Sequence, residues 1–351
     1  MASLEDFNRF FPYKVLRYAD RIEKILRGEF PPPVVMHIYP SNICNASCSF
    51  CIMKEEKKRY PVKLPKEVLI KAINDCREND VKLVHFSGGG EPLTNEAVIE
   101  ALKKAKSNGS TNLKTALTTN GILLKPEIAD YIDHLRISLN AGSSSIHQKV
   151  MGVSKDTFFQ VLENVADVVE RKKTKRLSID IGLAFLITPE NWMDIYNFCR
   201  LAKALEVDFV HIRPAYYPKG DERGELARMI VPSAFALAEK ARSDFEDEDF
   251  KIYSVKDKFD GYWTPRTYDR CRATPLSAVL AADGSFVVCQ DVFIRFGDYK
   301  RQSFWEIWDS EEHRQAIESI KLDECPRCVE NIHNQIIQHC FIENRPRMEL
   351  I

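Results

Sequence analysis

Hydrophobic positions divide the first 215 residues into two alternating kinds of segment. Short runs of apolar and β-branched residues are typical of buried strands, and they occur at residues 34–39, 81–86, 113–118, 135–139, 177–187 and 209–212. The stretches between them place apolar residues at helical spacing, at residues 64–78, 95–106, 126–131, 156–171 and 192–205. This alternation predicts βαβ units and a parallel sheet. The functional loops of such a sheet follow the C-terminal ends of its strands.

The pattern changes at both ends of this region. Residues 1–30 predict a short helical lead-in, which the prolines at 31–33 end. Beyond residue 214 the sequence predicts a loop, a helix, a β-hairpin that turns at Asp283-Gly284, and a further helix, at residues 216–226, 231–242, 277–281 with 285–289, and 303–320. We therefore expect three parts, residues 1–30, 31–215 and 216–351.

Charge and composition narrow the class of protein. The 351 residues carry 50 basic and 51 acidic side chains, so no net field attracts the chain to nucleic acid or an anionic membrane. The N-terminus lacks the features of a signal peptide, and no apolar stretch reaches the ~20 residues that span a bilayer. We expect a cytoplasmic protein that binds neither nucleic acid nor membrane. Because that compartment keeps thiols reduced, the ten cysteines indicate metal or redox chemistry rather than disulfides.

Three cysteines, Cys44, Cys48 and Cys51, lie close together in a polar loop after the first predicted strand. Thiolates bind zinc or iron–sulfur clusters. A structural zinc site needs a fourth cysteine or histidine close by, and this loop has none. Three thiolates on a cube of four irons leave one iron open to another ligand, so the arrangement favours an iron–sulfur cluster.

The sequence CNASCSFC contains these cysteines, with Phe50 before the last of them, and resembles the C-x3-C-x2-C motif of the radical S-adenosylmethionine (SAM) superfamily. The resemblance implies an α/β fold, a partial (β/α)6 TIM-like barrel, with a [4Fe–4S] cluster on the three cysteines. It also implies that the cluster reduces the sulfonium of SAM, which yields methionine and a 5′-deoxyadenosyl radical. The family expectation for the electron donor is a flavodoxin or ferredoxin. The protein itself then supplies binding and orientation.

Further motifs resemble the SAM contacts of the family. Residues 87–92, SGGGEP, follow the second predicted strand and resemble the GGE(P) motif that meets the SAM amino group. Glycines allow close backbone approach, and Glu91 can pair with an ammonium. The polar ends of the next two strands resemble contacts to ribose or carboxylate, with turn capping as the equal alternative for each residue. The predicted cofactor-binding residues are Phe50, Gly88, Gly89, Gly90, Glu91, Asn120, Ser138 and Asn140. Where many relatives place an arginine for the SAM carboxylate, this chain has Lys149, whose geometry differs.

A second set of cysteines follows the hairpin pattern, at Cys271, Cys289, Cys325 and Cys328. Four thiolates suit a zinc site or a fully ligated auxiliary [4Fe–4S] cluster. The spacing resembles Twitch, a shortened form of the SPASM domain, and implies a small C-terminal α+β domain with an auxiliary cluster. A full SPASM domain would continue with cysteines where this chain has Asn334 and Gln338, so we expect one auxiliary cluster.

The other cysteines and one arginine complete the candidates. Cys76 and Cys199 lie among apolar residues in predicted helices, which favours packing. For Cys340 three roles compete: packing, a spare cluster ligand, or hydrogen-atom donation to a substrate radical. Arg213 ends the sixth predicted strand and is expected to point into the cavity. Cys340 and Arg213 are the predicted catalytic residues.

The resemblance also indicates a reaction class. A fully ligated auxiliary cluster suits electron transfer, as in the Twitch enzyme that dehydrogenates an aminocyclitol. We therefore expect radical oxidation, dehydrogenation or epimerisation of a small polar molecule, sugar-like or cyclitol-like. The rival is modification of a ribosomally made peptide, whose enzymes often carry an N-terminal module of ~80 residues that this chain lacks before its first strand. A third class, a non-enzymatic iron–sulfur carrier, leaves the SGGGEP and strand-end motifs unexplained.

Overall fold

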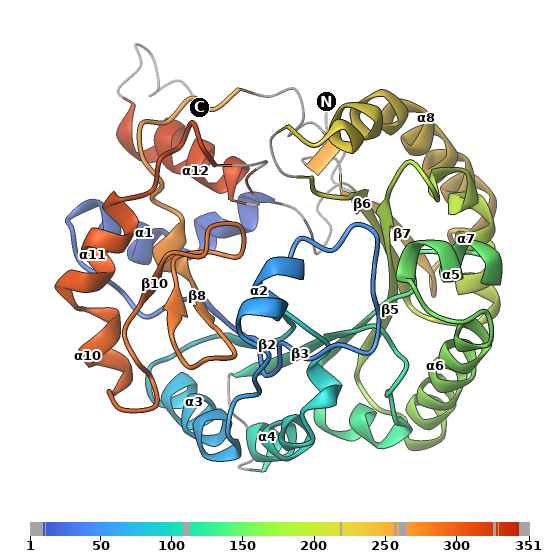
Figure 1. Cartoon of the computed structure of the whole chain (residues 1–351), viewed down its shortest axis with the longest axis horizontal. Coiled ribbons are helices and arrows are strands. Elements are labelled where there is room, and N and C mark those ends of the chain that lie inside the picture. Colours follow the sequence, from blue (N-terminus) through green and yellow to red (C-terminus); the bar gives the residue numbers. More distant parts are fainter. Residues whose placement is uncertain are drawn as a thin grey trace.

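A computed structural model of the chain describes residues 10, 12–107, 113–217, 220–255, 258–259, 265–325, 328 and 330–343. Its centre is one curved sheet in the order β10-β9-β8-β1-β2-β3-β4-β5-β6-β7 (Figure 1). The strands from β8 through β1 to β7 run parallel, and β9 and β10 extend one edge antiparallel. Their bounds are Val35–Ile38 (β1), Leu83–Phe86 (β2), Lys114–Thr119 (β3), His134–Ser138 (β4), Asp180–Ile187 (β5), Phe209–Pro214 (β6), Lys251–Ser254 (β7), Ser277–Leu280 (β8), Phe286–Val287 (β9) and Arg295–Phe296 (β10).

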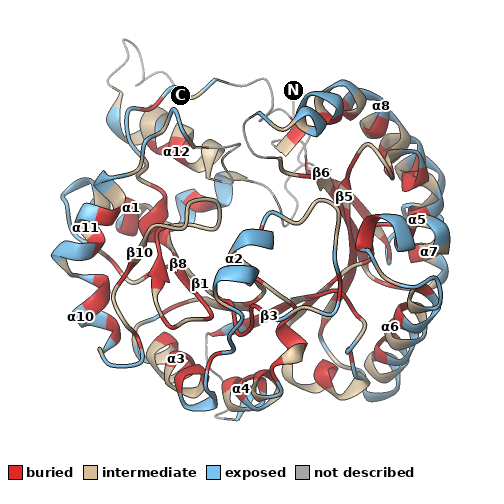
Figure 2. Ribbon diagram, viewed as in Figure 1, coloured by how far each residue is buried: buried red, intermediate tan, exposed pale blue. Residues whose placement is uncertain are grey.

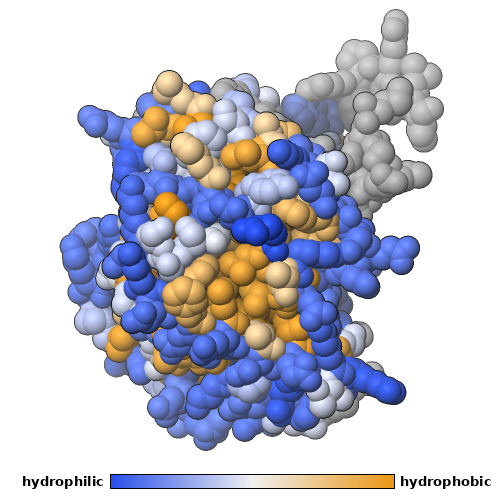
Figure 3. Space-filling model, turned by 90° about the vertical axis from the view of Figure 1, so that its right-hand side faces the viewer, coloured by the Kyte–Doolittle hydropathy of each residue, from blue (hydrophilic) through white to orange (hydrophobic). Residues whose placement is uncertain are grey.

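Most of the helices form an outer layer around the convex side of this sheet, and their inner faces are buried against it (Figure 2). The α-helices are Ala19–Leu26 (α1), Lys54–Arg59 (α2), Lys66–Glu78 (α3), Ala97–Lys106 (α4), Ser144–Met151 (α5), Asp156–Lys175 (α6), Ile195–Ala204 (α7), Glu222–Phe245 (α8), Phe304–Trp308 (α10), Glu311–Glu318 (α11) and Asn331–Ile337 (α12). Shorter helical turns are Pro12–Tyr18 (η2), Pro92–Thr94 (η3), Pro126–Tyr131 (η4), Trp192–Asp194 (η5), Thr274–Leu276 (η6) and Gln338–Ile342 (η7). The face that carries α6, α7 and α8 is mostly hydrophilic around a central apolar area (Figure 3). None of the described helices has the length and apolar character that crossing a membrane requires.

The six strands predicted for the barrel are all present, and the α/β fold class is confirmed. The sequence did not predict α2, α5, α12 or β10, and it missed two features just after the barrel region. Helix α8 begins at Glu222, within a stretch expected to be a loop, because the Asp221 side chain accepts a hydrogen bond from the backbone NH of Arg223 and caps the helix. Strand β7 then pairs parallel with β6, so the α/β alternation continues past residue 215.

The predicted hairpin is confirmed and lies in the same sheet. Val279 pairs with Val287 across its two strands, and Gly284 in the turn has a φ of +93°, which favours glycine. Strand β8 also pairs parallel with β1, Val35 opposite Ser277. The C-terminal region therefore completes the sheet beside the first strand.

The single helix expected at residues 303–320 is wrong, because the chain forms two helices there. The Ser303 hydroxyl and Glu306 make a capping box that begins α10. Ser310 begins α11 by accepting a hydrogen bond from the backbone NH of His313. Ser310 therefore divides one apolar pattern into two helices.

An aromatic cluster joins these helices to the hairpin. The Trp308 ring stacks on Phe304 at 5.6 Å and meets Phe286 edge-on at 6.0 Å. The indole NH of Trp308 donates a hydrogen bond of 2.9 Å to the carbonyl of Pro31, just before β1. Trp308 thus ties the C-terminal helices to the start of the barrel.

Replacing Trp308 with alanine is therefore expected to lower the free energy of unfolding by about 3–5 kcal/mol, through the cavity and the lost packing. Trp305, on the same helix, is 40% exposed, so Trp305→Ala is the matched control and should cost under ~1 kcal/mol. Urea unfolding followed by circular dichroism measures both. Equal midpoint shifts for the two variants would contradict the assignment of Trp308 as a core anchor.

Candidate functional site

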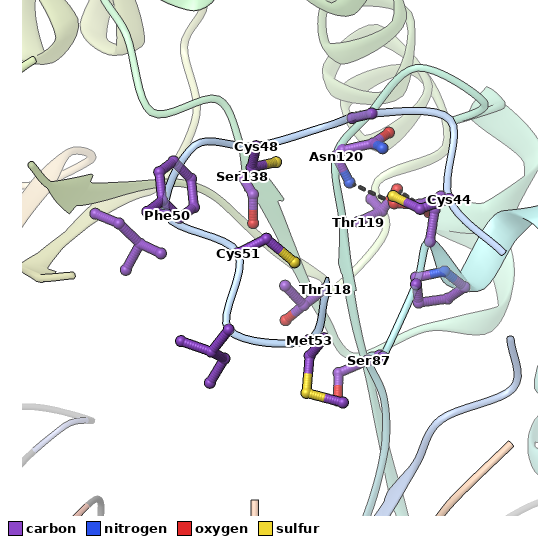
Figure 4. Close-up of a pocket in the computed structure, with 18 of the residues that line it drawn as sticks. Cys44, Cys48, Phe50, Cys51, Met53, Ser87, Thr118, Thr119, Asn120 and Ser138 are labelled. Carbon is purple, nitrogen blue, oxygen red and sulfur yellow. Dashed lines mark hydrogen bonds between the residues drawn. The ribbon is translucent and has the colours of Figure 1, made fainter. Parts of the chain in front are cut away.

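A cavity of about 290 Å³ lies at the C-terminal ends of the barrel strands. The loop after β1 contributes the three cysteines Cys44, Cys48 and Cys51, and the loop after β2 contributes residues 87–92. Figure 4 shows the three sulfur atoms directed into the space between this loop and the strand ends. Over the described residues, no three His, Cys, Asp or Glu side chains form a group arranged to hold a metal ion. The three thiols instead share the wall of one cavity.

Backbone hydrogen bonds hold the cysteine loop from two sides. On one side, the NH groups of Gly90 and Glu91 donate to the carbonyls of Ser41 and Ile43 at 2.8 and 2.9 Å. On the other side, the NH of Ser47 donates to the carbonyl of Met151, at the end of α5, at 3.0 Å. Hydrogen bonds within the protein therefore hold the loop in place relative to β2 and α5.

The glycines after β2 are needed for this close contact. A Cβ on Gly90 would lie 2.3 Å from the carbonyl oxygen of Ile43, and one on Gly89 would lie 2.0 Å from Oδ1 of Asn42. A Cβ on Gly88 would meet the carbonyl oxygen of Gly90 at 2.4 Å. Real Cβ atoms do not approach oxygen so closely, so Gly89 and Gly90 permit the cysteine loop to pack on the strand end, and Gly88 permits the tight turn of residues 88–90.

Glu91 lies at the junction of β2 and β3 and is 3% exposed. Its carboxylate accepts hydrogen bonds from the Thr119 hydroxyl at 2.7 Å, the Asn120 backbone NH at 2.8 Å and the Leu93 NH at 3.1 Å. Burial raises the pKa of Glu91, and these hydrogen bonds oppose that shift. The carboxylate thus joins two strand ends. Its contact with the SAM amino group stays a prediction.

Two predicted asparagines also stabilise the wall of the cavity. The Asn120 side-chain NH₂ donates to Oδ1 of Asn45 in the cysteine loop at 2.6 Å. Asn140 has a φ of +57°, and its Oδ1 accepts the backbone NH of Leu186 at 2.8 Å. Both residues line the cavity together with Phe50 and Ser138. The structure therefore gathers every predicted cofactor-binding residue around one space.

Burial changes the protonation of the thiols. It raises the pKa of Cys48 to about 12 and also raises the pKa of Cys44. Metal-free, these thiols are protonated at neutral pH, and a bound metal would replace their protons. Three soft donors on one loop fit a cluster that keeps one open coordination site.

The second cysteine set converges on a separate, small cavity. Cys271, Cys289, Cys325 and Cys328 all line it, and burial raises the pKa of Cys328 to about 12. Backbone NH groups of Val292 and Glu330 donate to the sulfurs of Cys289 and Cys328 at 3.2 and 3.3 Å, and such hydrogen bonds tune cluster sulfurs. The four donors fit a fully ligated metal group.

Asn334 stands where a longer SPASM pattern would have a cysteine. Its side-chain NH₂ donates to the sulfur of Cys271 at 3.3 Å, and its Oδ1 accepts the NH groups of Arg272 and Ala273 at 2.7 and 3.0 Å. Asn334 therefore orients a ligand-type cysteine and holds the chain beside it.

A short segment connects the two cavities. Asp291, two residues after Cys289, lines both of them. Gln290 lines the larger cavity and contacts His37 at 2.8 Å, and His37 contacts His85 at 3.1 Å. Burial lowers the pKa of His37 to about 4, so its imidazole is neutral at pH 7. Sequence reasoning missed these residues, because only the folded hairpin brings them to the strand ends.

The predicted catalytic residues lie in different places. Arg213, at the end of β6, lines the larger cavity as expected. Cys340 is exposed on η7 and lines neither cysteine cavity, so its role stays a prediction without support from position. Cys76 and Cys199 are fully buried in α3 and α7, which confirms packing for both.

A parallel α/β barrel with a three-cysteine loop at its strand ends, next to a four-cysteine cavity, defines an iron–sulfur protein with two sites. Residues 38–202 match the radical SAM superfamily, and residues 271–329 match SPASM, an iron-sulfur cluster-binding domain. Residues 38–202 therefore form a radical SAM domain, and residues 271–329 form a SPASM domain. The first domain implies SAM and a [4Fe–4S] cluster, and the second implies auxiliary iron–sulfur ligation.

Similar proteins differ in what their names say they act on. A probable GTP 3′,8-cyclase of Saccharolobus islandicus (strain Y.N.15.51 / Yellowstone #2) is 28% identical over 50% of this chain and 55% of its own length. The dTDP-4-amino-4,6-dideoxy-D-glucose ammonia-lyase of Streptomyces venezuelae is 24% identical over 56% of this chain and 44% of its own length. The chain thus spans about half the length of these curated relatives. The crystal structure of Streptococcus suis SuiB bound to S-adenosylmethionine has a TM-score of 0.63 at 17% identity, over 92% of this chain and 73% of SuiB. At that identity the likeness shows the fold alone.

Gly90→Ala tests whether backbone contact positions the cysteine loop. The new Cβ would collide with the Ile43 carbonyl, so we expect the reconstituted protein to lose more than half of the roughly four irons that the triplet binds. Gly224→Ala is the matched control, because its Cβ would meet Tyr217 at an ordinary 3.4 Å. Iron analysis measures both variants. Full iron content in Gly90→Ala would refute the role of this contact.

Proposed function

We propose that the protein cleaves SAM reductively and uses the resulting radical to oxidise a small polar, sugar-like or cyclitol-like molecule. One observation carries the proposal: the triplet and the four later cysteines line two neighbouring cavities, and Asp291 lines both. A site that generates a radical therefore lies beside a site that can receive an electron.

Each part of the larger cavity has an assigned task in this proposal. Cys44, Cys48 and Cys51 would hold a [4Fe–4S] cluster, which when reduced supplies the electron that splits SAM into methionine and a 5′-deoxyadenosyl radical. The glycines at 88–90 leave room for ligand atoms beside the loop. Asn120 and Ser138 present polar groups from the ends of β3 and β4 to the remainder of SAM. The residues from β6 and the hairpin are left for the substrate.

The balance of electrons supports oxidation of the substrate. Removing a hydrogen atom from a C–H bond leaves a substrate radical, and a two-electron oxidation then requires that radical to lose one electron and one proton. Four cysteine ligands leave no open iron for a substrate, so one auxiliary [4Fe–4S] cluster on Cys271, Cys289, Cys325 and Cys328 suits electron acceptance. Epimerisation instead needs a hydrogen-atom donor, and Cys340 lines neither cavity. Position therefore favours dehydrogenation over epimerisation.

The names of two similar proteins support the proposed substrate class. The named substrate of the Streptomyces relative is a nucleotide sugar, and that of the Saccharolobus relatives is a nucleotide. Both are small polar molecules of the kind proposed here. The rival class is a peptide, since SuiB has been solved with its precursor peptide SuiA. We propose a flavodoxin or ferredoxin as the donor of the first electron and the cytoplasm as the location.

Removing the two cysteine sets separately is expected to give different losses. The wild type should bind about eight irons per chain. With Cys44, Cys48 and Cys51 all changed to alanine, about four irons should remain and 5′-deoxyadenosine production should stop. With Cys325 and Cys328 changed to alanine, SAM cleavage should continue while product formation stops. Iron analysis and chromatography of 5′-deoxyadenosine measure these outcomes.

Two results would overturn these assignments. Continued 5′-deoxyadenosine production in the triplet variant would refute the SAM-cleaving site. About four irons with one zinc in the wild type would refute the auxiliary cluster and leave the second cavity as a zinc site.

The reaction is tested by incubating the reconstituted protein with SAM, dithionite and a panel of nucleoside diphosphate sugars, free sugars and cyclitols. We expect 5′-deoxyadenosine above the substrate-free level and a product lighter by two hydrogen atoms, measured by mass spectrometry. A product of unchanged mass that gains one deuterium from D₂O would indicate epimerisation instead. Turnover of a peptide encoded next to the gene, with none of the panel, would favour the rival class.

A further inference from the structure

Arg136 lines the cavity, and the proposed function gives it no role. It lies in the middle of β4, between Leu135 and Ile137, which are fully buried in the outer hydrophobic core. Because side chains alternate along a strand, Arg136 and Ser138 face the barrel interior. Both line the cavity of the cysteine triplet. Arg136 sits one pleat further from the strand end than Ser138.

The guanidinium has no hydrogen bond or ion pair within the described part of the chain. Other sheltered arginines are satisfied. Arg21 donates to the Pro32 carbonyl at 2.8 Å and to the Asp80 carboxylate at 3.0 Å. Arg295 pairs with Asp283 at 2.9 Å and also with Glu56. Sheltered cations are ordinarily paired, so Arg136, which is partly buried and has no partner among the described residues, is the exception that calls for a ligand.

The groups around Arg136 do not offset its charge. His37, His85 and His211 all have a pKa lowered mainly by burial, with a further contribution from the charge of Arg136, so these imidazoles are neutral at pH 7. Burial lowers the pKa of Arg136 itself to about 10, and it stays protonated. The interior at this depth is therefore electropositive.

The charged side chains on the cavity wall also make this region electropositive. The charged side chains that line it are Lys57, Glu91, Arg136, Arg213 and Asp291. Glu91 already accepts three hydrogen bonds from the protein. Three cations and two carboxylates thus line the cavity, so its wall carries a net positive charge. An anion entering the cavity would be attracted toward β4.

We propose that Arg136 binds an oxyanion of the substrate, a phosphate or carboxylate group. A guanidinium presents paired NH donors that match either group in a bidentate contact. The anion would also pair with the partly buried charge that has no partner among the described residues. The inference rests on the proposed function only in taking this cavity as the substrate's cavity, and it narrows the substrate class from polar to anionic.

Binding of two probes, inorganic phosphate and acetate, tests the proposal on the full-length reconstituted protein saturated with SAM. Titration calorimetry should show that the wild type binds at least one probe and that Arg136→Gln weakens its Kd at least tenfold. Arg136→Lys keeps the positive charge but loses the paired NH donors of the guanidinium, so its Kd should lie between those of the wild type and Arg136→Gln. Arg301 is 86% exposed in its side chain, so Arg301→Gln is the matched control and should bind as the wild type. The probe that responds identifies the oxyanion, and equal binding by Arg136→Gln, or none by the wild type, overturns the proposal.

Two further measurements separate this role from others. Arg136→Gln should bind SAM with a Kd within twofold of the wild type; a parallel loss of SAM binding would assign the arginine to the SAM carboxylate instead and overturn the proposal. Without phosphate or acetate, the Tm of Arg136→Gln should equal or exceed that of the wild type, because an unpaired charge is removed; a lower Tm would indicate a structural role. Failure of the proposed function would be seen separately, as a wild type that binds phosphate through Arg136 yet makes no 5′-deoxyadenosine.

Discussion

The close backbone contact between the cysteine loop and the end of β2 is the constraint on which the site depends. The loop can pack on the strand end only because Gly89 and Gly90 lack side chains. The hydrogen bonds that its Ser41 and Ile43 carbonyls accept from the NH groups of Gly90 and Glu91 then set where the three thiols lie. Glu91 extends the same junction to β3, and Asn120 returns from β3 to the loop. The position of the three thiols is thus set by contacts of the loop with the ends of β2 and β3.

Parallel strand order explains how distant residues share one cavity. Each strand from β1 to β6 delivers its C-terminal end to the same edge, so residues separated by loops and helices become neighbours. The hairpin adds the segment after Cys289 from the other side, which brings the second cysteine set close to the first. The proximity of the two cysteine-lined cavities follows from this topology alone.

Much of this arrangement could be predicted from the sequence, for identifiable reasons. The barrel strands are apolar runs, and the cysteines are clustered at spacings that match a known motif. Strand β7 (KIYS) was not predicted, because half of its four residues are polar and it is not an apolar run. The break before α11 depends on the hydroxyl of Ser310, and the pattern of apolar residues gives no sign of such a cap. Arg136 and Asp291 were missed because a single charged residue in a strand or loop has no pattern, and its meaning comes only from what the fold leaves unpaired or places nearby.

The pairing of β8 with β1 has a consequence for biosynthesis. Strand β1 leads directly into the cysteine loop, yet one of its neighbours in the sheet lies about 240 residues further along the chain. The first strand emerges early from the ribosome and must wait, with one edge bare, until the C-terminal region has been made. The loop that holds the triplet therefore reaches its final surroundings only after residues 277–280 have been made, so we expect the cluster to be inserted after that stage of synthesis.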